Sequence, residues 1–248
     1  MIQGVLDPRS KAYLYLYYRL YKKESFPSVG HLLNVYGRAR SEVSFLQIGA
    51  NEGSTEDPLY PHIRLRNWKG ILVEPLAEEF KLLKHNYQNN PGLIFENVAI
   101  ADREESRTLY TIDKTTGEVP FWVSKLSSFD PSIPQQVKQS FPNAVVIEKQ
   151  VPCTTIENLL NKHNLGNLQV LVIDAEGYDF EIIKTVNWDN VQPELVIFEH
   201  RHLSEADQQS CQQLFRNLGY EIYCADFDTV VFKDEALRKV YLDHLLPS

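Results

Sequence analysis

From residue 43 onward, short apolar runs alternate with segments whose apolar residues recur at helical spacing. The apolar runs predict buried strands, and the amphipathic segments predict the helices between them. Strand, helix and strand repeated in this order indicate a parallel sheet with right-handed crossovers. The predicted strands are 43–48, 70–74, 93–99, 168–174 and 193–199, and the predicted helices are 57–66, 76–89, 154–163, 178–186 and 204–218.

The end of the chain follows another pattern. Residues 220–224 and 229–232 are two further apolar runs, and only residues 225–228 separate them. A spacer this short and rich in turn residues predicts an antiparallel hairpin. The pattern therefore predicts an α/β fold: a mainly parallel, seven-stranded sheet that finishes in this hairpin, with helices on both faces.

The first predicted strand ends in a glycine-bracketed loop that suggests a cofactor site. Phe45 to Ile48 is an apolar run, and Gly49-Ala50-Asn51-Glu52-Gly53 follows it. In an open α/β sheet, a cofactor usually lies at the end of the first strand. Glu74 ends the second strand, 21 residues after Gly53, where a carboxylate can accept hydrogen bonds from a ribose diol. This combination predicts an adenosine-containing cofactor, and an ordinary strand-to-helix turn is the alternative.

The glycine spacing argues against a dinucleotide. A pyrophosphate site needs G-x-G-x-x-G, but Asn51 stands at the second glycine position and Glu52 adds a negative charge. A cofactor without phosphate, such as S-adenosylmethionine, suits this loop better. A nicotinamide-dependent oxidoreductase is a weaker alternative, because both the spacing and the terminal hairpin disfavour it.

Carboxylates follow two neighbouring strands. Asp174 and Glu176 come after strand 168–174, and Glu199 and His200 end strand 193–199. Desolvating a carboxylate is costly, so a ligand or metal is expected there; for Glu176, an N-terminal helix position is the alternative reading. We predict His200 as the general base, with Glu176 in reserve, or Mg²⁺ or Mn²⁺ held by Asp174 and Glu199. His202 is expected to be solvated or to cap a helix, and the remaining histidines are expected at the surface: His31, His62, His85, His163 and His244.

Two regions depart from the alternation. Residues 103–152 hold candidate strands and a proline-rich and aromatic stretch, which we interpret as an insertion over the cofactor end of the sheet; a structural loop is the alternative. Residues 1–42 are predicted as an N-terminal helical appendage to the main domain, 43–248. Its five clustered tyrosines would suit a lid, a dimer contact or packing on the domain's side.

These segments together resemble the FkbM family of S-adenosylmethionine-dependent methyltransferases over residues 44–235. The elements are Ile48 to Gly53, Glu74-Pro75, Asn97-Val98-Ala99, Ser127-Ser128, Thr155 to Leu160, Asp174 to Tyr178 and Glu199-His200. The resemblance implies a class I Rossmann-like fold and O-methylation of hydroxyls on sugars or natural products. The cofactor contacts that we expect are Gln47, Gly49, Ala50, Asn51, Gly53, Glu74, Pro75, Asn97, Val98, Ser127, Ser128 and Asp174.

One position departs from the family pattern. The first loop of the family usually begins with an Asp, and this chain has Gln47 there. An amide can still bond the cofactor's amino group but brings no charge, which could cost about 1–2 kcal/mol. A scaffold that binds the cofactor without catalysis is therefore a further alternative.

Composition narrows the partners. The net charge of −8 and the absence of a Lys/Arg-rich run argue against nucleic acid. The three cysteines form no C-x-x-C pair, which indicates a reducing compartment. No apolar run reaches membrane-spanning length, and the first residues lack signal-peptide features. We therefore expect a cytoplasmic protein that acts on a small-molecule or glycan acceptor and can form a homodimer.

Overall fold

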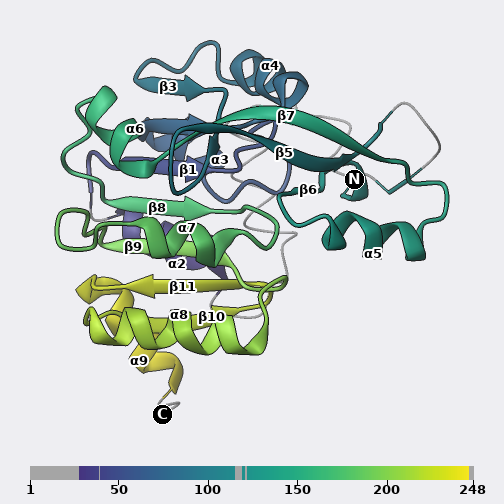
Figure 1. Cartoon of the computed structure of the whole chain (residues 1–248). Helices are drawn as coiled ribbons and strands as arrows, with labels where there is room; N and C mark the ends of the chain where they lie inside the picture. The colour runs from purple at the N-terminus through teal and green to yellow at the C-terminus, as the bar shows by residue number, and fades with distance from the viewer. Residues whose placement is uncertain (1–27, 39, 115–118, 121, 246–248) are drawn as a thin grey trace, which may run out of the picture.

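A seven-stranded sheet forms the centre of the computed structural model, which describes residues 28–38, 40–114, 119–120 and 122–245. Its order is β10-β11-β9-β8-β1-β2-β3, and neighbouring strands are parallel from β3 through to β9. β11 pairs antiparallel with both β9 and β10, so the predicted fold class is confirmed (Figure 1). The strands are β1 (Ser44–Ile48), β2 (Lys69–Val73), β3 (Leu93–Glu96), β8 (Val170–Ile173), β9 (Leu195–Glu199), β10 (Glu221–Ala225) and β11 (Asp228–Phe232).

Helices cover both faces of this sheet. Successive strand residues point to opposite faces, so Phe45 and Leu46 belong to different core clusters. Leu33 and Leu237 pack in the cluster of Phe45, whereas Phe215 packs in that of Leu46. The first face is covered by α2 (Val29–Arg38), α3 (Tyr60–Arg66), α4 (Ala77–Asn86) and α9 (Glu235–Leu245), and the second by α6 (Ile156–Lys162), α7 (Asp179–Thr185) and α8 (Glu205–Asn217).

Two of these helices begin at side-chain caps. The Thr155 hydroxyl accepts a hydrogen bond from the backbone N–H of Asn158 at 3.0 Å, at the start of α6. Ser204 accepts one from Asp207 at 3.1 Å, at the start of α8. Each cap satisfies a backbone N–H that has no partner inside the helix, which fixes where the helix begins.

The predicted insertion, 103–152, forms a second sheet together with β4, in the order β4-β7-β5-β6. β5 and β7 make a long antiparallel ribbon that Figure 1 shows reaching beyond the main sheet, with α5 at its far end. Lys125 pairs with Glu52 and Lys114 pairs with Glu79, so ion pairs tie this region to the first loop and to α4. Its elements are β4 (Ala99–Ile100), β5 (Glu105–Ile112), η1 (Val123–Lys125), β6 (Ser127–Ser128), α5 (Ser132–Ser140) and β7 (Val146–Thr154). The insertion and domain boundaries themselves stay predictions.

The described part of the predicted appendage belongs to the core. Leu32, Leu33 and Tyr36 of α2 are buried against the main sheet. The Tyr36 hydroxyl donates to Glu194 at 2.8 Å, and Arg40 bonds the same carboxylate at 2.5 Å. The tyrosine cluster that suggested a lid or dimer contact lies outside the described residues.

Several local predictions differ from the structure. The predicted strand 93–99 is two short strands, β3 and β4, in different sheets. α5 was not predicted because Pro131 and Pro134 were read as loop signals; they occupy the N-cap and first turn, where proline fits a helix. α9 was not predicted either.

The expected surface position of His62 is wrong. Its side chain is only 2% exposed and stacks on Trp68 with ring centroids 4.7 Å apart, because both rings belong to the core. Burial lowers the pKa of His62 to about 3, so this imidazole is neutral. His163 was also expected at the surface, and its Nε2 atom lies 2.5 Å from the Glu96 carboxylate.

Among the residues that the structure describes, no helix has both the length and the apolar character needed to cross a membrane.

Candidate functional site

Two adjoining pockets open at the carboxyl ends of β1, β2, β8 and β9. The larger is a cleft of about 1210 Å³, and the narrower pocket, about 50 Å³, lies between β2, β4 and the insertion. Both are bordered by Gly49, Asn51, Lys125, Asp174 and Glu176. A ligand in the narrower pocket and one in the cleft would therefore meet beside these five residues.

Gly49 brings the ends of β1 and β8 together. Its φ of +79° lies in the left-handed region, and a Cβ there would lie 1.8 Å from the Asp174 carbonyl oxygen. The N–H groups of Gly49 and Ala50 both donate to the Val73 carbonyl, at 3.0 and 2.9 Å. Only glycine permits this turn, which puts Asp174 beside the loop. Gly53 lies farther from the pockets and packs under the loop, against Leu83.

Glu74 is held by backbone donors. One carboxylate oxygen accepts from the N–H of Asn51 at 2.9 Å, and the other from Leu76 at 2.8 Å. The side chain is 3% exposed, and burial raises the pKa of Glu74 to about 7. Pro75 lines the same narrow pocket. The carboxylate predicted to meet a ribose is thus rigidly placed at the pocket wall.

Asn97 serves the loop rather than the pocket. Its amide nitrogen donates to the carbonyls of Glu74 and Pro75, at 2.8 and 3.0 Å. The pocket wall is formed by the following residues, including Val98 and Ala99. The Asn97 side chain, expected among the cofactor contacts, therefore bonds the end of β2 and lines neither pocket.

The predicted serines lie where the insertion meets β8. Ser127 lines the narrow pocket. Ser128 is 1% exposed and donates to the Glu176 carbonyl at 2.7 Å, while it accepts from Asp130 at 3.1 Å. Ser128 thus fixes the loop that carries Glu176, although it does not border either pocket.

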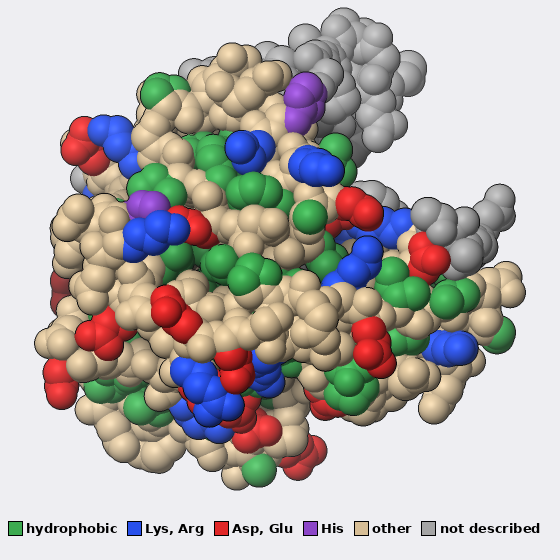
Figure 2. Space-filling model, turned by 45° about the horizontal axis from the view of Figure 1, so that its top comes forward, with side chains coloured by type: hydrophobic (Ala, Val, Ile, Leu, Met, Phe, Trp, Pro, Cys, Tyr) green, Lys and Arg blue, Asp and Glu red, His purple; other side chains and the backbone are tan. Residues whose placement is uncertain are grey.

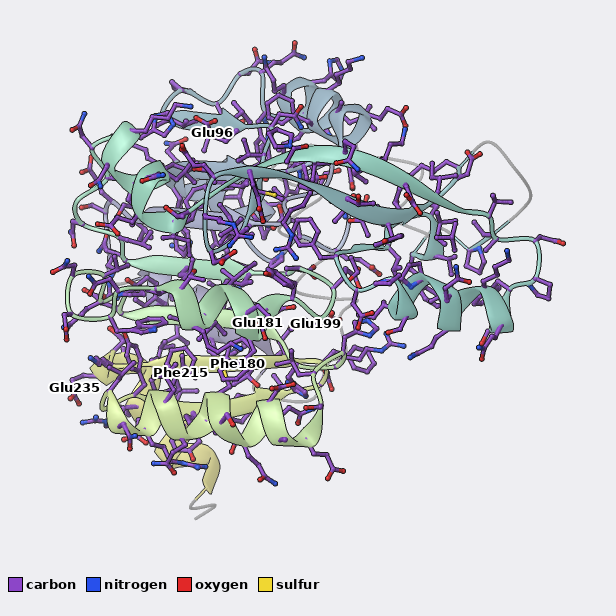
Figure 3. The ribbon with its side chains drawn as sticks, viewed as in Figure 1. Glu96, Phe180, Glu181, Glu199, Phe215 and Glu235 are labelled. Atoms are coloured by element: carbon purple, nitrogen blue, oxygen red, sulfur yellow. The ribbon has the colours of Figure 1, made fainter. Side chains whose placement is uncertain are left out.

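A charged cluster occupies the cleft wall after β8 and β9. His202 Nε2 lies 3.3 Å from Glu176 Oε2 and 3.8 Å from Glu199 Oε2. These three side chains offer ligand atoms that all lie within 4.8 Å of one another. Figure 3 shows Glu199 at the end of β9 on the side of α5. The predicted metal pair was Asp174 with Glu199, which both line the cleft; Glu199 also converges with Glu176 and His202.

Like charges crowd this cluster. Asp174 is exposed to the cleft but surrounded by protein, and this partial dehydration, with Glu176 and Glu199 nearby, raises its pKa well above the usual value. Burial raises the pKa of Glu199 to about 7. The hydrogen bond to Glu176 raises the pKa of His202.

On the face shown in Figure 2, Lys and Arg side chains are interspersed with Asp and Glu.

The structure places His202, and not the predicted base His200, at the cleft. The Nδ1 atom of His200 lies 3.0 Å from the Thr229 hydroxyl on β11, and the side chain does not line the cleft. His202, expected to be solvated or capping, is half-buried in the cleft. β9 ends at Glu199, and the turn that follows brings the His202 side chain close to the Glu199 carboxylate. The spacing of the residues in the sequence did not predict this turn.

Sequence reasoning also missed Asp57 and Lys125. Asp57 is 6% exposed and accepts from Gln47 Nε2 at 3.1 Å, and both residues line the cleft. The predicted cofactor contact Gln47 is therefore hydrogen-bonded through its amide nitrogen to the Asp57 carboxylate. In the sequence, Asp57 and Pro58 indicated the start of a helix. That interpretation gave no reason to place the Asp57 side chain beside the cleft.

A family model for the methyltransferase FkbM domain matches residues 47–222, more than two thirds of the chain. The chain belongs to this family. The motifs on which the resemblance was based, from Ile48 to His200, all lie within the matched residues. A search of curated proteins found no match to this FkbM chain.

Solved structures share the general architecture of the FkbM chain. Precorrin-6y methyltransferase from Geobacter metallireducens GS-15 has 9% identity and a TM-score of 0.40, covering 82% of this chain and 86% of that one. The N-terminal domain of human METTL16 in complex with SAH has 12% identity and a TM-score of 0.43, covering 82% and 68%. Human methyltransferase 10 domain containing protein has 13% identity and a TM-score of 0.43, covering 86% of each. Likeness at this level carries no functional weight.

The FkbM site fits the chemistry of S-adenosylmethionine. The Oε1 atom of Gln47 and the Oδ1 atom of Asn51 are buried acceptors without a hydrogen-bond partner among the described residues. Three carboxylates, Asp174, Glu176 and Glu199, face the cleft, as a cationic ligand requires. At about 50 Å³ the narrow pocket is smaller than typical ligand sites, and it is lined by Phe129 and Tyr178, whose rings are in edge contact with centroids 5.1 Å apart.

Proposed function

We propose that this FkbM domain methylates a hydroxyl oxygen on a sugar or natural-product acceptor. When bound, S-adenosylmethionine supplies an electrophilic methyl group, which passes to the acceptor oxygen while the bonding electron pair stays on sulfur. The observation that carries the proposal is the Glu176–His202 pair at 3.3 Å, beside the residues that border both pockets.

His202 is the base in this proposal. An alcohol must lose its proton as it is methylated, and the ring nitrogen of His202 that does not face Glu176 is the acceptor for that proton. Glu176 accepts a hydrogen bond from the protonated ring and so orients and stabilises it. Asp174 and Glu74 do not react; they align the two ligands, which removes much of the entropic barrier.

Aromatic side chains at the cleft support a sugar-like acceptor. Trp122 is 46% exposed and Phe227 is 56% exposed, and both line the cleft. Exposed rings of this size offer flat contact area to the apolar face of a sugar ring. The Arg201 guanidinium lies over Phe227 at 4.6 Å and keeps donors beside it.

The test is methyl transfer to a panel of sugars, nucleotide sugars and natural-product alcohols. His202→Gln is expected to lower turnover by about 10²–10⁴-fold while S-adenosylhomocysteine binding is retained. His200→Gln is the matched control and is expected to keep turnover, because its ring contacts Thr229 instead. Full turnover by His202→Gln would contradict the role of the base. Cofactor binding without turnover on any acceptor would favour the scaffold alternative.

A divalent cation is the second candidate role for the same cluster. Two carboxylates and one imidazole within 4.8 Å suit Mn²⁺ better than Mg²⁺. A cation there would lower the pKa of the acceptor hydroxyl and leave His202 as a ligand. Titration of the EDTA-treated protein with Mn²⁺, followed by electron paramagnetic resonance, is expected to show one site that Glu199→Gln abolishes. Turnover unchanged by EDTA would exclude this role.

A further inference from the structure

The turn that carries Glu176 has a strained backbone. Glu176 and Gly177 have φ angles of +49° and +93°, and the Tyr178 N–H donates to the Ala175 carbonyl at 3.1 Å. Two successive residues with positive φ inside such a hydrogen bond are the pattern of a type I′ turn, whose central positions favour Gly, Asn and Asp. Glu176 is none of these, so its left-handed conformation costs free energy. Strain of this kind persists only where the surrounding contacts enforce it.

The strained turn places Glu176 against His202. A Cβ at Gly177 would lie 2.5 Å from Ile133 Cδ1 and 3.2 Å from His202 Cβ. Glycine therefore allows the turn to pack closely between α5 and the segment that follows β9. At this approach, Glu176 Oε2 lies 3.3 Å from His202 Nε2. The geometry of the Glu176–His202 pair thus depends on the backbone conformation of residues 175–178.

Asp179 is the first of two side chains that hold this turn. It is the first residue of α7, and it is 0% exposed. Its Oδ2 atom accepts from the Gly177 N–H at 3.1 Å, and its Oδ1 atom accepts from the Ala175 N–H at 3.4 Å. One buried side chain therefore bonds the backbone on both sides of Glu176. Burying a carboxyl group is costly unless hydrogen bonds replace its hydration, and these two bonds do so only while the turn keeps its shape.

Ser128 holds the same turn from the insertion. Its hydroxyl donates to the Glu176 carbonyl at 2.7 Å. The side chain is 1% exposed and also accepts from the Asp130 N–H at 3.1 Å, which fixes the direction of the hydroxyl. Asp179 and Ser128 together therefore bond three successive residues of the turn, 175–177, from two different parts of the fold.

We propose that Asp179 and Ser128 are positioning residues for methyl transfer, which hold Glu176 in the left-handed conformation that brings its carboxylate to His202. Neither side chain borders the cleft or the narrow pocket, so both act through Glu176 and not through a ligand. Glu176 in turn orients the ring of the base. This inference rests on the proposed function, because it assumes that His202 is the base.

The test is a graded series at residue 179 of the full chain, assayed with S-adenosylmethionine and the acceptor that the panel identifies. Asp179→Ala removes both acceptor atoms and is expected to lower kcat about tenfold, whereas Asp179→Asn keeps one acceptor and is expected to fall between this variant and the wild type. The KM for S-adenosylmethionine is expected to change by less than about threefold. Glu181→Ala removes an exposed carboxylate from the same helix and is the matched control, which should leave kcat unchanged.

A double variant shows whether Asp179 acts through Glu176. Once Glu176→Ala has removed the carboxylate, the shape of the turn no longer matters to His202. Adding Asp179→Ala is then expected to lower kcat by less than about twofold. A loss of the same size in both backgrounds would overturn the inference. Ser128→Ala, combined with Glu176→Ala in the same way, gives the same reading if circular dichroism shows that Asp179→Ala does not fold.

The outcomes separate this inference from the proposed function. If the wild type methylates no acceptor in the panel, the proposed function fails and the inference fails with it. If the wild type is active and Asp179→Ala keeps its kcat, only the inference fails. If Asp179→Ala raises the KM for S-adenosylmethionine as much as it lowers kcat, Asp179 supports the cofactor pocket and not the base, which also contradicts the inference.

Discussion

The loops after β1 and β2 and the cluster after β8 and β9 lie at one edge of the same sheet, yet different forces hold them. In the loops, backbone groups hold the site: two N–H groups converge on the Val73 carbonyl, and two more on the Glu74 carboxylate. In the cluster, side chains hold one another, with His202 between Glu176 and Glu199.

The difference separates positioning from reaction. A group held by backbone hydrogen bonds keeps one geometry because its donors are themselves fixed, which suits the binding of a constant cofactor. Side chains that share a proton or a cation change their interactions as charge moves, which suits a reacting hydroxyl. Under the proposed function, the reaction rather than stability accounts for the like charges that lie near one another in the cluster.

The largest expected effect comes from Gly49→Ala in the backbone-held loop. The new Cβ would lie 1.8 Å from the Asp174 carbonyl oxygen, at a φ of +79°. β1 and β8 would have to separate, so we expect a loss of about 3–5 kcal/mol in the free energy of unfolding, with loss of cofactor binding. Urea unfolding followed by circular dichroism measures it.

Gly219→Ala is the control for that loss. Gly219 has the same φ of +79°, but none of the described residues, its chain neighbours apart, places a heavy atom within 4 Å of the position that an alanine methyl would take, so only backbone strain remains. We expect about 1–2 kcal/mol. Equal losses for the two variants would mean that the close approach of β1 and β8 contributes nothing.

A smaller effect is expected from Glu74→Gln. The amide keeps one acceptor and turns a donor toward the N–H of Asn51 or Leu76, so one buried N–H loses its partner. We expect a cost of about 2 kcal/mol in unfolding free energy and at least tenfold weaker S-adenosylhomocysteine binding. Calorimetry measures the affinity, with exposed Glu78→Gln as the control. Unchanged affinity would remove Glu74 from the cofactor site.

The same contrast explains what the sequence could predict. Gly49, Asn51 and Glu74 were predicted because their roles follow from backbone geometry: a left-handed turn and a carboxylate at a strand end. The continuous apolar runs likewise predicted helices on both faces of the sheet, since a strand that is apolar throughout is buried on both sides.

Side-chain contacts across the fold were not predictable in this way. His202 and Asp57 reach the cleft through turns whose direction depends on packing elsewhere: the β11 pairing that engages His200, and the α3 start that follows Asp57. Prolines at the start of α5 concealed a helix for a similar reason, because proline signals either a loop or a first turn.

The smallest expected effect, and of opposite sign, comes from Glu199→Gln in the side-chain-held cluster. Burial raises the pKa of Glu199 to about 7 from its usual 4.5, so the folded state holds a proton that the unfolded state has lost between these values. Stability therefore falls as the pH rises from 4.5 to 7, and the neutral amide removes that penalty. Asp228 lies opposite Glu199 on β11 and adds to the repulsion.

We expect Glu199→Gln to gain about 1 kcal/mol in unfolding free energy at about pH 8.5 and nothing at about pH 4.5. Urea unfolding of EDTA-treated protein at both pH values measures the difference, and Glu78→Gln is again the control. A loss of stability at the higher pH would show that the Glu199 charge is compensated in the folded protein. The contrast between a loop optimised for geometry and a cluster that tolerates repulsion would then fail, since both regions would be stabilised by their own contacts.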